Sequence, residues 1–159
     1  MTISSQIAKQ LRAVYFGGNW TTSNMKDQLV DVDLEMATYQ AFGLNTIATL
    51  LFHTSYYITA VIEVLEGKPL TASDKFSFTH PQLHSELDWK LMVENSLNDA
   101  EKFAKLVEKL PDELLLEDFT DGKYGNYYRN LTGIIEHTHY HLGQIAVIKK
   151  ILQQKFKEN

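Results

Sequence analysis

The stretch Gly133-Ile-Ile-Glu-His-Thr-His-Tyr-His-Leu-Gly-Gln144 contains two histidines, His137 and His141, that are four residues apart. In a helix, side chains at this spacing lie on the same face. Ile134 and Ile145 fall on that face too, so the histidines point toward the expected core. The stretch therefore predicts a helix that presents two metal-ligating side chains to the interior.

A third histidine, His53, lies on another apolar segment with helical periodicity. Two imidazoles supply only half of a four-coordinate site, so a third ligand is expected from elsewhere in the chain. A single histidine on an apolar face is usually a hydrogen-bonded core residue, but three at buried positions are hard to satisfy without a cation. We therefore predict a divalent metal site formed by His53, His137 and His141.

The remaining histidines and the nearest acid fit the site less well. His139 lies about 200° around the helix from His137, which predicts a packing or surface residue. Glu136 lies about 100° away and is expected to be a solvated or supporting carboxylate rather than a general base. His80 and His84 fall in a polar connection and are expected on the surface. The sequence leaves open whether His80, His84 or Glu136 contributes to the site.

Two further polar side chains lie one helical turn from a predicted ligand. Gln144 follows His141. It could orient a ligand or a bound water, or it could be an ordinary polar residue of the helix, and the sequence favours neither interpretation. Tyr57 follows His53, and a core tyrosine is the preferred interpretation over a hydrogen-bond donor to the site.

Four segments carry the periodicity of amphipathic helices, and no segment alternates like a strand. Two polar connections, 71–84 and 112–126, are long enough to cross between distant helices. This pattern predicts an all-α fold, a four-helix bundle with long crossover loops, forming a single domain over residues 1–159. The predicted helices are 4–15, 45–67 with Asn45 as N-cap, 85–111 with a capping box of Ser85 and Asp88, and 127–156, with partly helical turns at 25–30 and 33–39.

The composition restricts the chemistry of the protein. The chain has 159 residues and no cysteine, so disulfides, cysteine ligands and a cysteine nucleophile are excluded. The net charge of −5 gives no indication of a basic surface that would bind nucleic acid. No run of 18 or more apolar residues and no secretory signal is recognised, so we expect a cytoplasmic protein without a membrane span.

The order of histidines resembles the DinB/YfiT-like family over nearly the whole chain. The segment Thr46-Ile-Ala-Thr-Leu-Leu-Phe-His53 is similar to the family's first-histidine segment, and His137-x-x-x-His141-x-Gly-Gln is similar to its second and third. The resemblance implies a four-helix bundle, often dimeric, with a three-histidine site for a divalent metal, commonly nickel or zinc.

Some members of this family are transferases or isomerases that use a low-molecular-weight thiol such as bacillithiol, mycothiol or glutathione. We therefore expect a metal-dependent enzyme with a small-molecule substrate and an external thiol. The first alternative is a metal-dependent hydrolase that uses water, and the second is a non-catalytic metal- or ligand-binding stress protein. The sequence does not specify the substrate, the reaction, the thiol or the physiological metal.

A second apolar stripe on the last helix suggests self-association. The core of a single bundle is not expected to cover both this stripe and the histidine face. We therefore predict a homodimer with this helix near the interface, and we expect Ile135→Glu to release monomer. The alternative is that the loops 71–84 and 112–126 cover the stripe, which consists of Leu131, Ile135, Leu142 and Ala146.

Overall fold

Four long helices account for most of the chain: α1 (Ile3–Phe16), α4 (Ile47–Leu65), α5 (Glu86–Glu108) and α6 (Tyr127–Lys157). The structure is a computed structural model that describes residues 1–158. Within this range it contains no strand, only an isolated antiparallel bridge between Asp118 and Asn126. The prediction of an all-α fold is confirmed.

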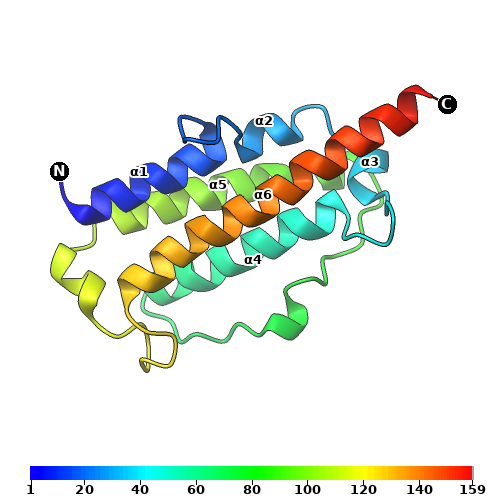
Figure 1. Ribbon diagram of the computed structural model, residues 1–159. Helices are drawn as coiled ribbons and strands as arrows, with labels where there is room; N and C mark the ends of the chain where they lie inside the picture. Colours follow the sequence, from blue (N-terminus) through cyan, green and yellow to red (C-terminus); the bar gives the residue numbers. More distant parts are fainter. Residues whose placement is uncertain (159) are drawn as a thin grey trace.

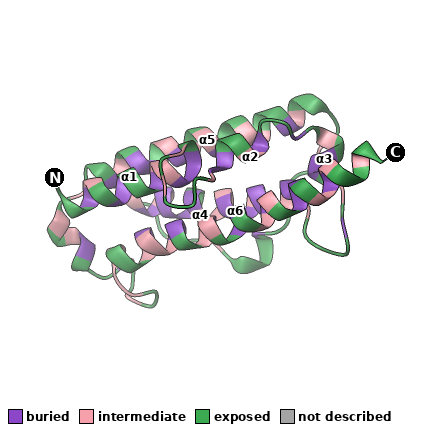
Figure 2. Ribbon diagram, turned by 45° about the horizontal axis from the view of Figure 1, so that its top comes forward, coloured by how far each residue is buried: buried purple, intermediate pink, exposed green. Residues whose placement is uncertain are grey.

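The long helices lie side by side (Figure 1). Helix α1 packs against α5 and α6, and α4 packs against the same two helices. Each long helix thus has two long neighbours, which is the arrangement of a four-helix bundle. Their buried residues face one another (Figure 2), and Tyr15, Trp89 and Phe103 are among the largest side chains in this core.

Short helices occupy the connections. The first connection contains α2 (Met25–Leu29) and α3 (Leu34–Thr38), as its partly helical pattern predicts. Each begins after a side-chain cap, because Asn24 accepts from the Asp27 amide and Asp33 accepts from the Met36 amide. The two longer loops also contain 3₁₀ turns, η1 (Asp74–Phe76) and η2 (Asp112–Leu116).

The helix caps agree with the sequence at one long helix and differ by one residue at another. Ser85 and Asp88 form the predicted capping box at the start of α5. At α4 the N-cap is Thr46, whose hydroxyl accepts from the Thr49 amide, so the prediction of Asn45 is wrong. Asn and Thr both favour this position, and two adjacent candidates cannot be separated by propensity alone.

The second apolar stripe of α6 is buried within the chain. Leu131, Ile135 and Leu142 are 0%, 8% and 2% exposed. Helices α1 and α2 and the 3₁₀ turn η2 of the 112–126 loop all pack against α6, so elements of this chain rather than a partner bury these three residues. The homodimer stays a prediction, but it no longer follows from an uncovered stripe.

Helix α4 is long and apolar enough to cross a membrane, with an 18-residue window of mean hydropathy 1.3. In the structure 61% of that window is buried. It supplies Leu50, Leu51 and Ile58 to the core. The burial of these side chains in the core of the bundle accounts for the apolar character of α4.

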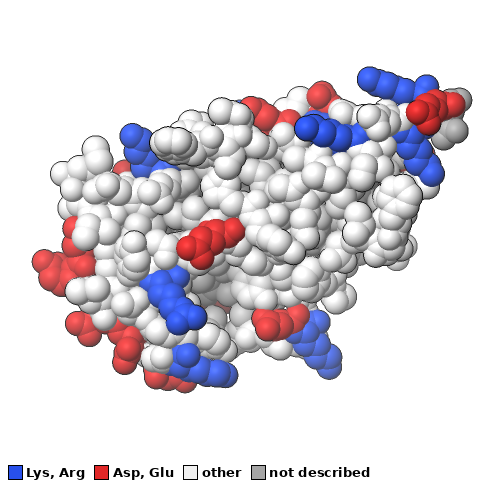
Figure 3. All heavy atoms as spheres, in the orientation of Figure 1, with Lys and Arg blue, Asp and Glu red and all other residues white. Residues whose placement is uncertain are grey.

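Charged side chains are sparse over much of the face seen in Figure 3. Lys and Arg residues stand mostly apart from one another on this face, except near the C-terminal end of α6. The basic residues there include Lys155 and Lys157 in the last turn, where a positive charge complements the helix dipole.

Candidate metal centre

His53, His137 and His141 meet between α4 and α6, as the sequence predicts. The Nε2 atom of His137 lies 3.0 Å from His53 Nε2 and 3.1 Å from His141 Nε2. The ligand atoms of all three residues lie within 4.8 Å of one another. His53 and His141 are buried, and His137 is half-buried. Three nitrogen donors from two helices thus converge on one point.

Local structure explains this convergence. His137 and His141 lie one turn apart on α6, and their rings are 4.5 Å apart between centroids. His53 lies on the buried side of α4, which packs against α6. Both helices are held by the core on either side of the histidines, and this packing brings the three imidazoles together.

Hydrogen bonds orient two of the three rings. The Nδ1 atom of His53 lies 3.3 Å from the Ser77 carbonyl oxygen, and His141 Nδ1 lies 2.7 Å from Gln144 Oε1. A carbonyl oxygen can only accept, so each Nδ1 carries a hydrogen and donates it. The Nε2 atoms of His53 and His141 then present lone pairs toward His137, which is the tautomer that a metal ligand requires.

The contacts between the three Nε2 atoms cannot all be hydrogen bonds. His137 Nε2 is in contact with two nitrogen atoms, but a neutral imidazole has at most one hydrogen there. It can therefore donate to His53 or to His141, and the lone pair of the other partner receives no hydrogen. A cation bound among the three Nε2 atoms removes this mismatch.

The electrostatics keep the cluster uncharged at neutral pH. Burial, with the added effect of His141 and His53, lowers the pKa of His137 to about 4. Burial is also the main cause that lowers the pKa of His53 and of His141, against the opposing hydrogen bonds to Ser77 and Gln144. Neutral imidazoles are the form that binds divalent metals.

Two of the three spacings between the nitrogen atoms fit a shared ion. Two nitrogen atoms about 2.0–2.1 Å from one zinc ion are about 3.4 Å apart at a tetrahedral angle and about 2.9 Å apart at a right angle. The two short Nε2 distances, 3.0 and 3.1 Å, agree with this range. Within residues 1–158 no carboxylate joins the group, so three protein ligands leave positions for an external molecule.

Aromatic side chains form the wall of the centre. Phe78 stacks on His53, and Tyr57 makes edge contacts with His53 and His137, each at 5.1 Å between centroids. The Tyr57 hydroxyl donates to the Asp74 carboxylate. It is thus occupied by the 71–84 loop and does not donate into the cluster.

The other residues considered from sequence lie outside the cluster. Glu136 and His84 are exposed. The half-buried His80 has Nδ1 2.7 Å from the Pro81 carbonyl oxygen. His139 faces away from the three histidines and borders a surface hollow beside α1, in agreement with its predicted packing role.

Sequence reasoning missed the part played by Ser77, Phe78 and Asp74. The loop carries two aromatic residues, Phe76 and Phe78; Phe76 is 56% exposed, and only Phe78 contacts the centre. The loop has no periodicity that distinguishes these two residues.

No protein-family model, curated protein or solved structure matches this chain in the three comparisons. The function is therefore inferred from the residues and geometry of the centre.

Proposed function

We propose that this chain binds one divalent metal ion through His53, His137 and His141 and acts as a metal-dependent enzyme of the DinB/YfiT-like kind. The observation that carries the proposal is the convergence of three neutral imidazoles, two buried and one half-buried, whose Nε2 atoms cannot satisfy one another. Imidazole ligands suit both zinc and nickel, and we propose one of these two metals.

The residues around the ligands have distinct tasks. The Ser77 carbonyl and the Gln144 amide oxygen hold His53 and His141 in the ligating tautomer. Phe78 covers one face of His53 and restricts the access of water from that side. A divalent ion held there supplies Lewis acidity, which favours the ionised form of a thiol or of water at neutral pH.

We further propose transfer or isomerisation with a low-molecular-weight thiol as cosubstrate. The support is the resemblance of the histidine segments to that family and the absence of cysteine, which makes an external thiol necessary for thiol chemistry. In a transfer, the thiol sulfur forms a bond to an electrophilic carbon, the leaving group departs with its electron pair, and the thiol proton is released to water. Cytoplasmic localisation is part of the same proposal.

Elemental analysis of protein purified without a histidine tag tests the metal site. We expect one nickel or zinc per chain in wild type and a marked loss in His53→Ala, His137→Ala and His141→Ala. His139→Ala is the matched control, because it removes an imidazole from the same helix outside the cluster, and it should keep its metal. Full metal content in all three ligand variants would refute the site.

An activity assay tests the reaction class. Metal-loaded protein is mixed with bacillithiol, mycothiol or glutathione and an electrophile such as 1-chloro-2,4-dinitrobenzene, with His137→Ala as control. A thiol-dependent rate above the control supports the proposal. No thiol-dependent rate above the control would overturn it, and hydrolysis without thiol would identify the hydrolase alternative. Full metal content without turnover would identify a binding protein.

A further inference from the structure

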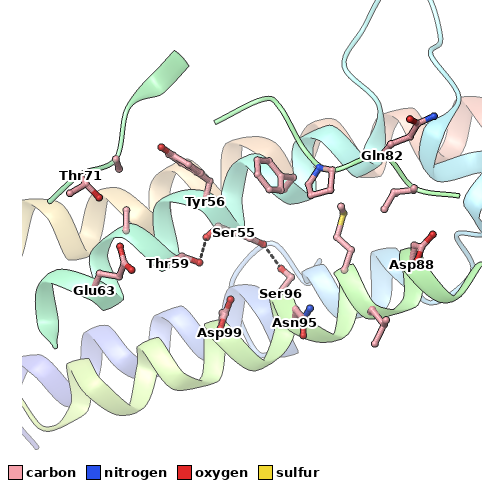
Figure 4. A pocket seen from close by; sticks show the side chains of 17 residues that line it. Ser55, Tyr56, Thr59, Glu63, Thr71, Gln82, Asp88, Asn95, Ser96 and Asp99 are labelled. Atoms are coloured by element: carbon pink, nitrogen blue, oxygen red, sulfur yellow. Dashed lines mark hydrogen bonds between the residues drawn. The ribbon is translucent and has the colours of Figure 1, made fainter. Parts of the chain in front are cut away.

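A separate cavity of about 590 Å³ lies between α4, α5 and the loop that follows α4. This volume is in the range of small-molecule sites, about 300–1,000 Å³. None of the three clustered histidines lines it. Apolar side chains form much of its wall (Figure 4), including Phe52, Tyr56 and Met92. The cavity therefore offers an apolar surface distinct from the metal centre.

The charges around this cavity are all negative. Glu63, Asp88 and Asp99 line it, and no Lys or Arg does. Two of these carboxylates have partners in the chain, since Glu63 lies 3.6 Å from Lys68 and Asp88 accepts from the amides of His84 and Ser85. The third carboxylate, Asp99, has no such ion-pair or backbone-amide partner among residues 1–158.

Asp99 is half-buried and forms no ion pair within the described residues 1–158. Lys102, one turn along α5, has its ammonium group 2.6 Å from Glu66. Figure 4 shows the Asp99 side chain pointing from α5 toward Thr59 on α4. Burial raises the pKa of the Asp99 carboxyl, against the opposing effects of Lys102 and the Thr59 hydroxyl. A negative charge on Asp99 thus has no cationic group of residues 1–158 in direct contact with it.

We propose that this cavity binds a small organic cation, with an ammonium group beside Asp99 and an apolar part against Phe52, Tyr56 and Met92. Charge complementarity supplies the first contact, because a bound ammonium compensates the Asp99 carboxylate. Near Asp99, the Ser55 hydroxyl donates to the buried Ser96 hydroxyl at 2.7 Å, so the polar side chains lie together at one part of the site.

Three ligands of the same skeleton test the charge preference in the full-length protein. Calorimetric titrations use 2-phenylethylammonium, neutral 2-phenylethanol and anionic phenylacetate. We expect the cation to bind roughly tenfold or more tightly than the alcohol, the scale of a hydrogen bond to a charged group, and phenylacetate to bind least. Equal affinity for cation and alcohol, or no binding of the cation, overturns the proposal.

A matched pair of variants distinguishes binding of the cation beside Asp99 from its general attraction to a negatively charged protein. Asp99→Asn keeps the side-chain shape but removes the charge. We expect this variant to lose the preference for the cation and to keep the wild-type affinity for 2-phenylethanol. Unchanged affinity for the alcohol shows that the cavity is intact. Glu94→Gln removes an exposed charge from the same helix outside the cavity and should bind as wild type does. An equal loss in both variants, or no loss in Asp99→Asn, overturns the assignment.

Discussion

Phe78 lies nearly parallel to His53, with ring centroids 3.8 Å apart and an angle of 15° between the planes. Its neighbour Ser77 accepts the hydrogen bond from the same imidazole. One short piece of an otherwise irregular loop thus both orients and covers a proposed ligand. The proposed metal centre therefore depends on the loop as well as on the two helices.

Replacing Phe78 with alanine should speed metal loss without changing the metal content. The substitution exposes one face of His53 to water, while the three ligands and their hydrogen bonds remain. We expect severalfold faster transfer of the metal from Phe78→Ala to a chelator, followed by absorbance. Phe76→Ala removes a neighbouring aromatic that does not touch His53, so its rate should equal that of wild type. Identical rates for both variants would show that Phe78 does not shield the site.

Gln144→Leu should weaken metal binding by about 10- to 100-fold, the usual effect of losing a partner that orients a ligand. Leucine cannot accept the hydrogen from His141 Nδ1, so the ring loses its fixed tautomer. Gln144→Glu retains an acceptor and should restore most of the affinity. Gln154→Leu, at an exposed position of the same helix, is the control for lost polarity. Competition with a chromophoric chelator measures all three, and wild-type affinity in Gln144→Leu would contradict the orienting role.

Asp112 should make folding stability depend on acid pH. Its carboxylate accepts from the Ile3 and Ser4 amides at the start of α1, and these hydrogen bonds lower its pKa from the ordinary value of 3.8. Because the folded-state pKa is the lower one, the stabilisation is present above pH 3.8 and is lost as the pH falls through the folded-state value.

Urea unfolding at a series of acid pH values measures this effect. Asp112→Asn should be less stable than wild type above pH 3.8, and the difference should shrink as the pH falls below that value. Glu113→Gln, on the same 3₁₀ turn but exposed, should follow the wild-type curve. A constant difference between Asp112→Asn and wild type would exclude this carboxylate as the cause.

Ile135→Glu should lower the free energy of unfolding by about 3 kcal/mol or more, because it places an unpaired charge in a buried position. This variant is therefore not a test of the dimer, although the sequence analysis had proposed it as one. Sedimentation of wild-type protein at micromolar concentration is the direct measurement, and a clean monomer would end the homodimer prediction. Urea unfolding of Ile135→Glu close to that of wild type would contradict the burial of this residue.

The centre was predictable where helical periodicity determines position. The spacing of His137 and His141 places both on one face of α6, and the apolar pattern around His53 places it on the buried side of α4. The capping signal at Ser85 was likewise local, since the cap and its partner lie within one turn.

Contacts between distant parts of the chain were not predictable in the same way. The contact of Ser77 with His53 joins a helix to a loop without a repeating pattern. The helical wheel predicts an apolar face that contains Ile135, but it does not identify α1, α2 and η2 as the other elements that pack against α6. Which of Asn45 and Thr46 caps α4 depends on where the chain turns into the bundle.

His53 and His137 are 84 residues apart in the chain, and all of α5 lies between them. An ion bound by both closes a loop that contains a whole helix, and an unfolded chain loses conformational entropy when such a loop closes. Metal affinity therefore measures how firmly α4 docks on α6, since only the docked chain presents all three imidazoles. By the same linkage, a substitution that loosens the α4–α6 contact far from the histidines should also weaken metal binding.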